Sequence, residues 1–291
     1  MTIHLHLGAH KTGSTHLQAV MRKNRHRLRE AGTVYAPPDQ LRDLIGPAQR
    51  AAAAVAPLPS LRAMSAARAL ARLADGAPKL LIAADENGLG HCGDMIRARR
   101  LYPEARARLG LWHRAARARD LTCFLAIRDY AAFFASVHIQ SVRDGPLAEM
   151  KKEDRIGLAA LPRRWPDLVA EIRRALPGAR LVMWEFDDYE ALRETVARRL
   201  SGQEGLKPVL RRSMQTPSIA AWAALQVVAA GREDRRVPKD VFRAVMADHP
   251  VTTNNPRYAP WATAEAARMT VAYHEDVAAL RADAGIEFLT P

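Results

Sequence analysis

The chain has 291 residues, enough to bury a large core, and 48% of them are hydrophobic, as in an ordinary globular protein. Lys and Arg exceed Asp and Glu by 44 to 31, which gives a formal net charge of +13. No segment approaches the roughly 20 apolar residues of a membrane helix, and two cysteines, Cys92 and Cys123, do not make a disulfide framework. The first predicted strand begins at residue 2 or 3, so we expect no signal peptide, no stable membrane insertion and a cytoplasmic location.

The excess positive charge consists mainly of arginines in alanine-rich stretches such as 98–100 and 115–119. Arginine is a good helix former, so this pattern predicts solvated helix faces. No basic stretch is interleaved with aromatic residues, and we therefore expect no nucleic-acid partner. A positive field would instead concentrate an anionic cofactor or acceptor near a site. A non-catalytic basic binding protein remains an alternative to an enzyme.

An apolar run at about 2–7 predicts a strand that leads through a glycine-containing loop into a helix over about 14–31. The start of a helix presents free backbone N–H groups and the positive end of the helix dipole, and such a site binds phosphate or sulfate. Lys11 adds a mobile cation to this loop. We therefore expect an anion-binding loop over residues 8–15.

The loop differs from the common nucleotide-triphosphate loop, G-x-x-x-x-G-K-[ST]. Gly8 and Gly13 have the glycine spacing of that loop, but the lysine stands earlier, at position 11, and Ser14 follows the second glycine. The order Lys-Thr-Gly-Ser-Thr resembles the 5′-phosphosulfate loop of sulfotransferases, which use 3′-phosphoadenosine-5′-phosphosulfate (PAPS). The donor-binding residues that this resemblance implies are His10, Lys11, Thr12, Gly13, Ser14 and Thr15.

The next elements alternate between extended and helical patterns. An extended segment at 33–38 precedes alanine-rich helices over 39–75, and a short strand at 79–84 precedes helices over 93–119. Strands separated by helices predict parallel βαβ units with helices on both faces of one sheet.

Glu86 follows the end of the strand at 79–84. Ligands bind at the carboxyl ends of strands in open α/β sheets, and a carboxylate or His near an acceptor hydroxyl can serve as its general base. Sulfotransferases place their base, a Glu or a His, on the element after the corresponding strand. The resemblance implies this role for Glu86, with Asp85 and His91 as alternatives.

A second motif follows the apolar strand predicted at 121–127, which ends in Arg128. A helix is predicted over 131–143, and it carries Ser136 eight residues after the arginine. Arg binds phosphate through two parallel hydrogen bonds. An ion pair between Arg128 and Asp129 is the alternative. Sulfotransferases carry an Arg and a Ser at this spacing to hold the 3′-phosphate. Together with the Lys11 loop, this pair makes the chain similar to the PAPS-dependent sulfotransferase superfamily and its bacterial members.

The remaining chain is mostly helical. Another helix is predicted up to about 175, then a strand at 179–184 and helices at about 188–201, 217–231, 238–248 and 263–284, with loops at 205–216 and 249–262. Arg212 lies in a segment that resembles a part of the bacterial family near the cofactor, although a solvated loop is an equal interpretation. The resemblance implies a three-layer, P-loop-type parallel β-sheet flanked by helices, with a helix-rich C-terminal part. We expect one domain over residues 1–291.

The function implied by the resemblance is in-line transfer of a sulfuryl group from PAPS to a hydroxyl or amine, with adenosine 3′,5′-bisphosphate as product. Lys11 would contact the phosphosulfate and Glu86 would act as base. His4 and His6 form an H-x-H pair that can bind metal, but no further clustered ligands follow, so we expect no metal. An ATP- and Mg-dependent P-loop kinase is the main alternative. The acceptor, a carbohydrate or a small metabolite, and the oligomeric state are not specified by these motifs.

Overall fold

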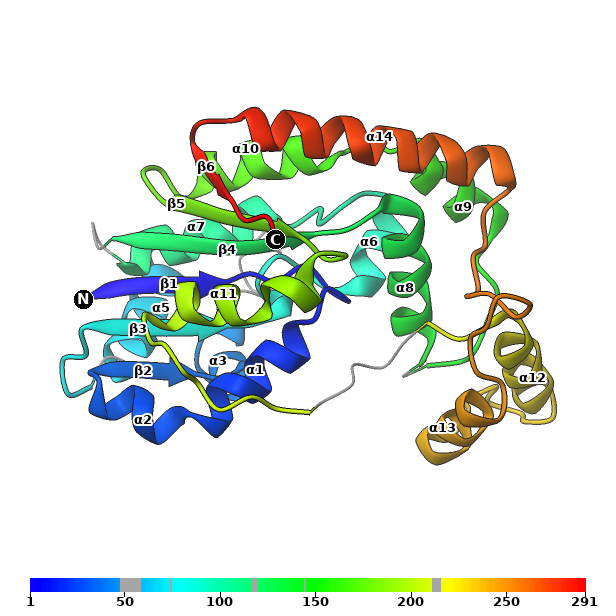
Figure 1. Ribbon diagram of the computed structural model, residues 1–291, viewed down its shortest axis with the longest axis horizontal. Coiled ribbons are helices and arrows are strands. Elements are labelled where there is room, and N and C mark those ends of the chain that lie inside the picture. The colour runs from blue at the N-terminus through cyan, green and yellow to red at the C-terminus, as the bar shows by residue number, and fades with distance from the viewer. Residues whose placement is uncertain (48–58, 74, 117–119, 144, 211–215) are drawn as a thin grey trace.

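The computed structural model describes residues 1–47, 59–73, 75–116, 120–143, 145–210 and 216–291, with 59–65 described by backbone alone. Within these ranges six parallel strands form one sheet in the order β2-β3-β1-β4-β5-β6 (Figure 1). Their bounds are β1 Thr2–His6, β2 Thr33–Ala36, β3 Leu80–Ala84, β4 Leu121–Ile127, β5 Arg180–Glu185 and β6 Ile286–Phe288. Helical segments connect the strands, as parallel pairing requires.

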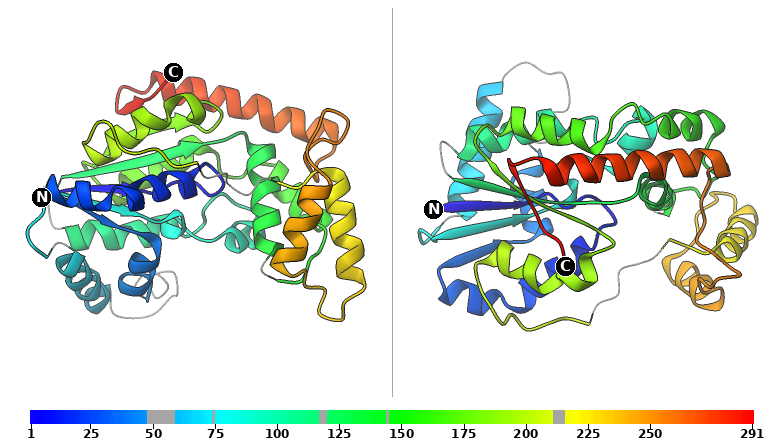
Figure 2. Two further views of the ribbon diagram at one scale, coloured as in Figure 1. Left: turned by 60° about the horizontal axis from the view of Figure 1, so that its bottom comes forward. Right: turned by 45° about the horizontal axis from the view of Figure 1, so that its top comes forward.

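Helices cover both faces of the sheet and dominate the chain after β5, which confirms the predicted three-layer α/β fold with a helix-rich C-terminal part (Figures 1 and 2). The helices are α1 Ser14–Lys23, α2 Arg25–Glu30, α3 Pro38–Leu44, α5 Pro59–Leu73, α6 Cys92–Ala98, α7 Ala105–Ala116, α8 Tyr130–Arg143, α9 Lys152–Ala159, α10 Trp165–Ala175, α11 Tyr189–Ser201, α12 Ile219–Ala230, α13 Lys239–Asp248 and α14 Thr263–Ala282, with a 3₁₀ turn, η1, at Glu86–Gly88.

The two faces of the sheet bury alternate residues of the same strands, because side chains along a strand point to opposite sides. On one face Leu5 and Leu125 pack with residues of α3, α5, α7, α10 and α14. On the other face Phe124 and Val182 pack with residues of α1, α2 and α11. Every residue of β4 is buried, as expected for a strand covered on both sides. The sheet therefore holds the ends of β1, β3 and β4 rigidly beside one another.

Helices α12 and α13 lie away from the sheet, beyond the carboxyl ends of its strands (Figure 1). Their buried residues form a separate apolar cluster with Ile139 of α8 and with Tyr258. Glu149 joins the parts of this cluster, because it accepts hydrogen bonds from the indole of Trp222 at 2.5 Å and the hydroxyl of Tyr258 at 2.8 Å. These contacts hold the segment that carries Arg257 against the end of α8.

Three elements differ from the sequence predictions. The helix predicted over 14–31 is interrupted at Asn24, whose side chain bonds to both the carbonyl and the N–H of Lys207. The helix predicted up to 175 is two helices, α9 and α10, separated at 160–164. The short edge strand β6 was not predicted. Its three residues are too few to give a period-2 pattern.

Among the residues that the structure describes, no helix is both long and apolar enough to cross a membrane.

Candidate active site

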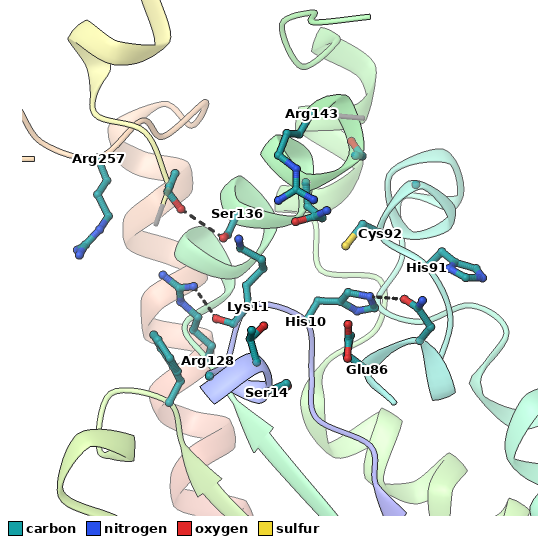
Figure 3. A pocket seen from close by; sticks show the side chains of 18 of the residues that line it. His10, Lys11, Ser14, Glu86, His91, Cys92, Arg128, Ser136, Arg143 and Arg257 are labelled. Carbon is teal, nitrogen blue, oxygen red and sulfur yellow. Dashed lines mark hydrogen bonds between the residues drawn. The ribbon is translucent and has the colours of Figure 1, made fainter. Parts of the chain in front are cut away.

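A cavity of about 640 Å³ lies at the carboxyl ends of β1, β3 and β4 (Figure 3). This is the edge at which open α/β sheets bind ligands. Lys11 and Arg128 both line this cavity, although they are separated by 117 residues. The predicted site residues that line it are His10, Lys11, Gly13, Ser14, Thr15, Glu86, Arg128 and Ser136.

The loop between β1 and α1 depends on backbone conformations that favour glycine. Gly13, the residue before α1, has φ 83°, and Gly8 has φ 31°. A Cβ at Gly8 would lie 2.5 Å from Oγ of Ser14, and one at Gly13 would lie 2.8 Å from the ring of Tyr189. Lys11 has φ 64°, which a residue with a Cβ adopts only at a cost in free energy. Position 11 therefore carries a lysine that lines the cavity, in a backbone conformation that glycine would adopt without strain.

The start of α1 offers hydrogen-bond donors to the cavity. The first intrahelical bonds run from His16 and Leu17 to the carbonyl of Gly13, so the N–H groups of Ser14 and Thr15 have no partner within the helix. Ser14 is buried and lines the cavity, and its hydroxyl has no hydrogen-bond partner among the described residues. Buried polar groups are normally paired, so this orphaned hydroxyl fits a bound anion.

Thr12, which was predicted to bind the donor, is not among the lining residues. Its hydroxyl donates to the carbonyl of Ala9 at 2.6 Å, and its side chain is buried. The side chain therefore stabilises the loop from within. A role for the backbone N–H of Thr12 stays a prediction.

Lys11 is the central cation of the cavity. Burial lowers the pKa of Lys11 to about 8, and the charges of Arg143 and Arg128 add to this effect. An anion placed beside the ammonium would favour its charged form and raise its pKa again. The ammonium is therefore poised to gain stability when a negative ligand binds.

Arg128 links the two predicted anion sites. Its Nη1 donates to the carbonyl of Lys11 at 3.0 Å, and its guanidinium lies 4.7 Å from the ring centroid of Phe186. Asp129, the alternative partner for Arg128, instead accepts from the N–H of Ala132 at 2.9 Å and the hydroxyl of Thr270 at 2.8 Å. The guanidinium is thus held at the cavity by the loop backbone and an aromatic ring.

Ser136 lies where the helix after β4 meets the cavity. The hydroxyl of Thr216 donates to its Oγ at 3.3 Å, and both side chains are buried. Arg257 lines the same region and lies near enough to Arg128 for its charge to lower the pKa of Arg128, after the larger effect of burial. Arg212 lies outside the residues that the structure describes.

Glu86 is ionised and held from two sides. Gln18 donates to its Oε2 at 2.7 Å, and Arg42 donates to its Oε1 at 3.0 Å. Burial alone would raise the pKa of Glu86, but the bonds from Gln18 and its own backbone, with the charge of Arg42, lower it below the usual value. The carboxylate is therefore ionised and its position is fixed, although the lowered pKa makes it a weaker base than an ordinary glutamate.

The two alternatives to Glu86 differ in where they lie. Asp85 does not line the cavity, and its Oδ1 accepts from Arg42 at 2.8 Å and from the N–H of Asn87 at 3.1 Å. His91 does line the cavity, and burial lowers its pKa, which favours the neutral ring. His91 is therefore the alternative that the geometry keeps within reach of a ligand.

His10 lies beside Glu86 and is held in a neutral form. Burial lowers the pKa of His10 to about 4. The side-chain amide of Asn87 bridges His10 and Arg42. Its NH₂ group donates to Nε2 of His10 at 2.9 Å, and its oxygen accepts from Arg42 at 3.2 Å. The hydroxyl of Tyr102 accepts from the backbone N–H of His10 at 2.8 Å and lies within hydrogen-bond distance of its Nδ1, at 3.0 Å. This network ties the anion loop to the segment that carries Glu86.

Sequence reasoning missed three of the cations in the cavity, which are Arg42, Arg143 and Arg257. With Lys11 and Arg128 they make five cations against the one carboxylate of Glu86 among the described lining residues. Nothing in the sequence marks these three among the many other arginines. Their remote positions converge only in the folded chain.

The H-x-H pair lies outside this cavity. His4 places Nδ1 2.7 Å from the carbonyl of Leu200, and His6 is buried with its ring stacked on Trp184. Within the described ranges, no group of three or more His, Cys, Asp or Glu residues is arranged to hold a metal ion.

Comparison with solved structures finds similarity to a sulfotransferase from Alicyclobacillus acidocaldarius. The two chains are 15% identical, the match covers 85% of this chain and 96% of that chain, and the TM-score is 0.39. No family model matches this sequence, and no curated protein matches it either.

Proposed function

We propose that the protein transfers a sulfuryl group from PAPS to a hydroxyl or amine of an acceptor. One observation carries this proposal: the Lys11 loop and the pair Arg128 and Ser136 line the same cavity. A donor with a phosphosulfate at one end and a 3′-phosphate at the other needs two anion sites in one cavity. The unpartnered hydroxyl of Ser14 and the cationic lining support an anionic donor.

The chain's own residues divide the binding and the chemistry between them. When bound, PAPS would supply an activated sulfuryl group. The N–H groups at the start of α1 would hold the 5′-phosphate, and Lys11 would stabilise the negative charge that develops on the leaving oxygen. Arg128 would bind the 3′-phosphate with two parallel hydrogen bonds, and Ser136 would add a third. Positioning and electrostatics would supply most of the rate.

Glu86 would take the proton from the acceptor. Its carboxylate is ionised, and Gln18 and Arg42 hold its two oxygens in place. A fixed base within reach of a bound hydroxyl is the requirement for general base catalysis. His91, which also lines the cavity, is the alternative that an experiment must separate from Glu86.

The charge arrangement favours a sulfuryl donor over ATP with Mg²⁺. Many Mg-dependent nucleotide enzymes need a carboxylate near the phosphates, whereas β4 is followed directly by Arg128. The cavity's one carboxylate among the described residues, Glu86, is bonded to Arg42 and Gln18. The sulfuryl group also carries less negative charge than a γ-phosphoryl group, and the protein's cations can neutralise it.

The test is a calorimetric titration with adenosine 3′,5′-bisphosphate, ATP and Mg-ATP. We expect the bisphosphate to bind most tightly, with no dependence on Mg²⁺. Lys11→Ala should weaken this binding, and the exposed Arg243→Gln on α13, which removes one positive charge elsewhere, should not. Tighter binding of Mg-ATP would favour a kinase. Binding of any polyanion, unaffected by Lys11→Ala and lost steeply with salt, would favour a basic binding protein.

A further inference from the structure

The cavity has a second side that the donor anchors do not use. We call the Lys11 loop, Arg128, Ser136, Thr216 and Arg257 the donor side. The acceptor side comprises Glu86, Asn87, His91, Cys92, Gln140 and Arg143. In Figure 3, Arg143 lies on the His91 and Cys92 side of Ser136, and Arg257 lies on the opposite side.

Arg143 is separated from the 3′-phosphate anchor along α8. It follows Ser136 by seven residues on one helix, and this corresponds to about 10 Å along the helix axis. Gln140 lies one turn before Arg143, so the two side chains share a face of the helix. The end of α8 therefore presents a cation and an amide to a part of the cavity beyond the donor anchors.

Arg143 contributes positive charge to the acceptor side of the cavity. Arg42, which also lines the cavity, pairs with Asp85 at 2.8 Å and Glu86 at 3.0 Å. Arg143 is also the largest charge contribution to the lowered pKa of Lys11, second only to burial. Its charge thus reaches the centre of the cavity, and a bound anion would relieve the repulsion between the two cations.

The lining of the acceptor side is polar. Gln140 and His91 place an amide and a ring nitrogen at this side, and Asn87 adds a second amide that is bonded to His10 and Arg42. Phe186, the one Phe, Tyr or Trp among the described lining residues, lies against Arg128 on the donor side. Pockets for flat apolar ligands are lined mainly by apolar and aromatic side chains. These polar groups instead suit a molecule with several hydroxyl groups.

We propose that the acceptor is a polyhydroxylated molecule with a carboxylate, and that Arg143 binds this carboxylate. The inference rests on the proposed sulfuryl transfer, because it treats the acceptor side as the place of the second substrate. Glu86 would repel the carboxylate, so the acceptor would orient with its anionic end at Arg143 and a hydroxyl at Glu86. Attraction at one end and repulsion at the other would select both the ligand and its orientation.

The test compares two sugars that differ in one group, methyl β-D-glucopyranoside and methyl β-D-glucuronide. Their affinities are measured by ligand-observed NMR with the protein saturated by adenosine 3′,5′-bisphosphate, so that the carboxylate does not enter the donor side. We expect the glucuronide to bind about tenfold more tightly than the glucoside, as a charged hydrogen-bonded pair implies. Arg143→Gln should abolish this preference, and Arg243→Gln should preserve it.

The outcomes separate this inference from the proposed function. Binding of adenosine 3′,5′-bisphosphate to Arg143→Gln within about twofold of wild type would keep Arg143 out of the donor side. A loss of more than about tenfold would assign Arg143 to the donor and overturn the inference, while the proposed function would stand. Equal binding of the two sugars, no binding of either, or a preference that survives Arg143→Gln would also overturn it. Failure of the wild-type protein to bind the bisphosphate would contradict the proposed function itself.

Discussion

The two sides of the cavity hold their charged groups in different ways. On the donor side, Lys11 and Arg128 follow the neighbouring strands β1 and β4, and Arg128 donates to the Lys11 backbone. On the acceptor side, Glu86 depends on side chains from two other elements, Gln18 of α1 and Arg42 of α3. The donor side is thus positioned by neighbouring strands of the sheet, and Glu86 on the acceptor side is positioned by hydrogen bonds from other side chains. Substitutions on one side should therefore leave the other side's ligand largely unaffected.

The largest expected effect is on turnover, from Glu86→Gln. This change keeps the shape of the side chain and removes the proton acceptor, so turnover should fall by about 10²- to 10⁴-fold. The affinity for adenosine 3′,5′-bisphosphate, measured by calorimetry, should stay within about twofold of wild type because the donor side is intact. His91→Gln is the matched comparison. A wild-type rate for Glu86→Gln together with a large loss for His91→Gln would transfer the role of base to His91.

A smaller effect, confined to the donor side, is expected from Arg128→Ala. The variant should lose about 10- to 100-fold in affinity for adenosine 3′,5′-bisphosphate, since a charged hydrogen-bonded pair is removed. Adenosine 5′-phosphate lacks the 3′-phosphate and should lose much less, with a residual loss because Arg128 also bonds to the carbonyl of Lys11. Calorimetric titration of both nucleotides measures the difference. Equal losses would show that Arg128 only stabilises the loop.

The pH dependence of donor binding tests whether the charge of Lys11 contributes to it. The pKa of Lys11 is lowered to about 8, so its positive charge is present below that pH and is lost above it. Affinity for the bisphosphate should therefore fall by up to about tenfold per pH unit above the pKa. Arginine stays protonated throughout this range, so Lys11→Arg should remove the decline. An equal decline in both proteins would assign the titration to another group.

The convergence of Lys11, Arg128 and Ser136 on one cavity was predictable because the signals in the sequence are local. The glycine spacing, Lys11 and the start of α1 occur within one short segment, and Arg128 and Ser136 share one strand and helix. Each motif needs only the direction of a strand and the start of a helix to place its side chains. The α/β fold followed from the alternation of apolar runs with helical patterns for the same reason.

The acceptor side was not predictable from such patterns. Arg42 and Gln18 reach Glu86 across 44 and 68 residues of chain. Arg143 carries no local signal that separates it from arginines on solvated helix faces. Asn24 illustrates the same limit for secondary structure, because it interrupts the first helix through bonds to Lys207, 183 residues away. Contacts between residues so far apart in the chain leave no pattern in the sequence from which they could be predicted.

The left-handed backbone of Lys11 has a consequence for the evolution of this loop. A glycine at position 11 would adopt φ 64° without strain. We expect Lys11→Gly to have a free energy of unfolding up to about 1 kcal/mol higher than Lys11→Ala, because both variants lack the ammonium and only glycine relieves the backbone strain. Chemical denaturation measures this difference, and an equal or lower value for Lys11→Gly would mean that the backbone bears no strain. If the gain is observed, selection has kept a less stable fold at this position in exchange for an ammonium group.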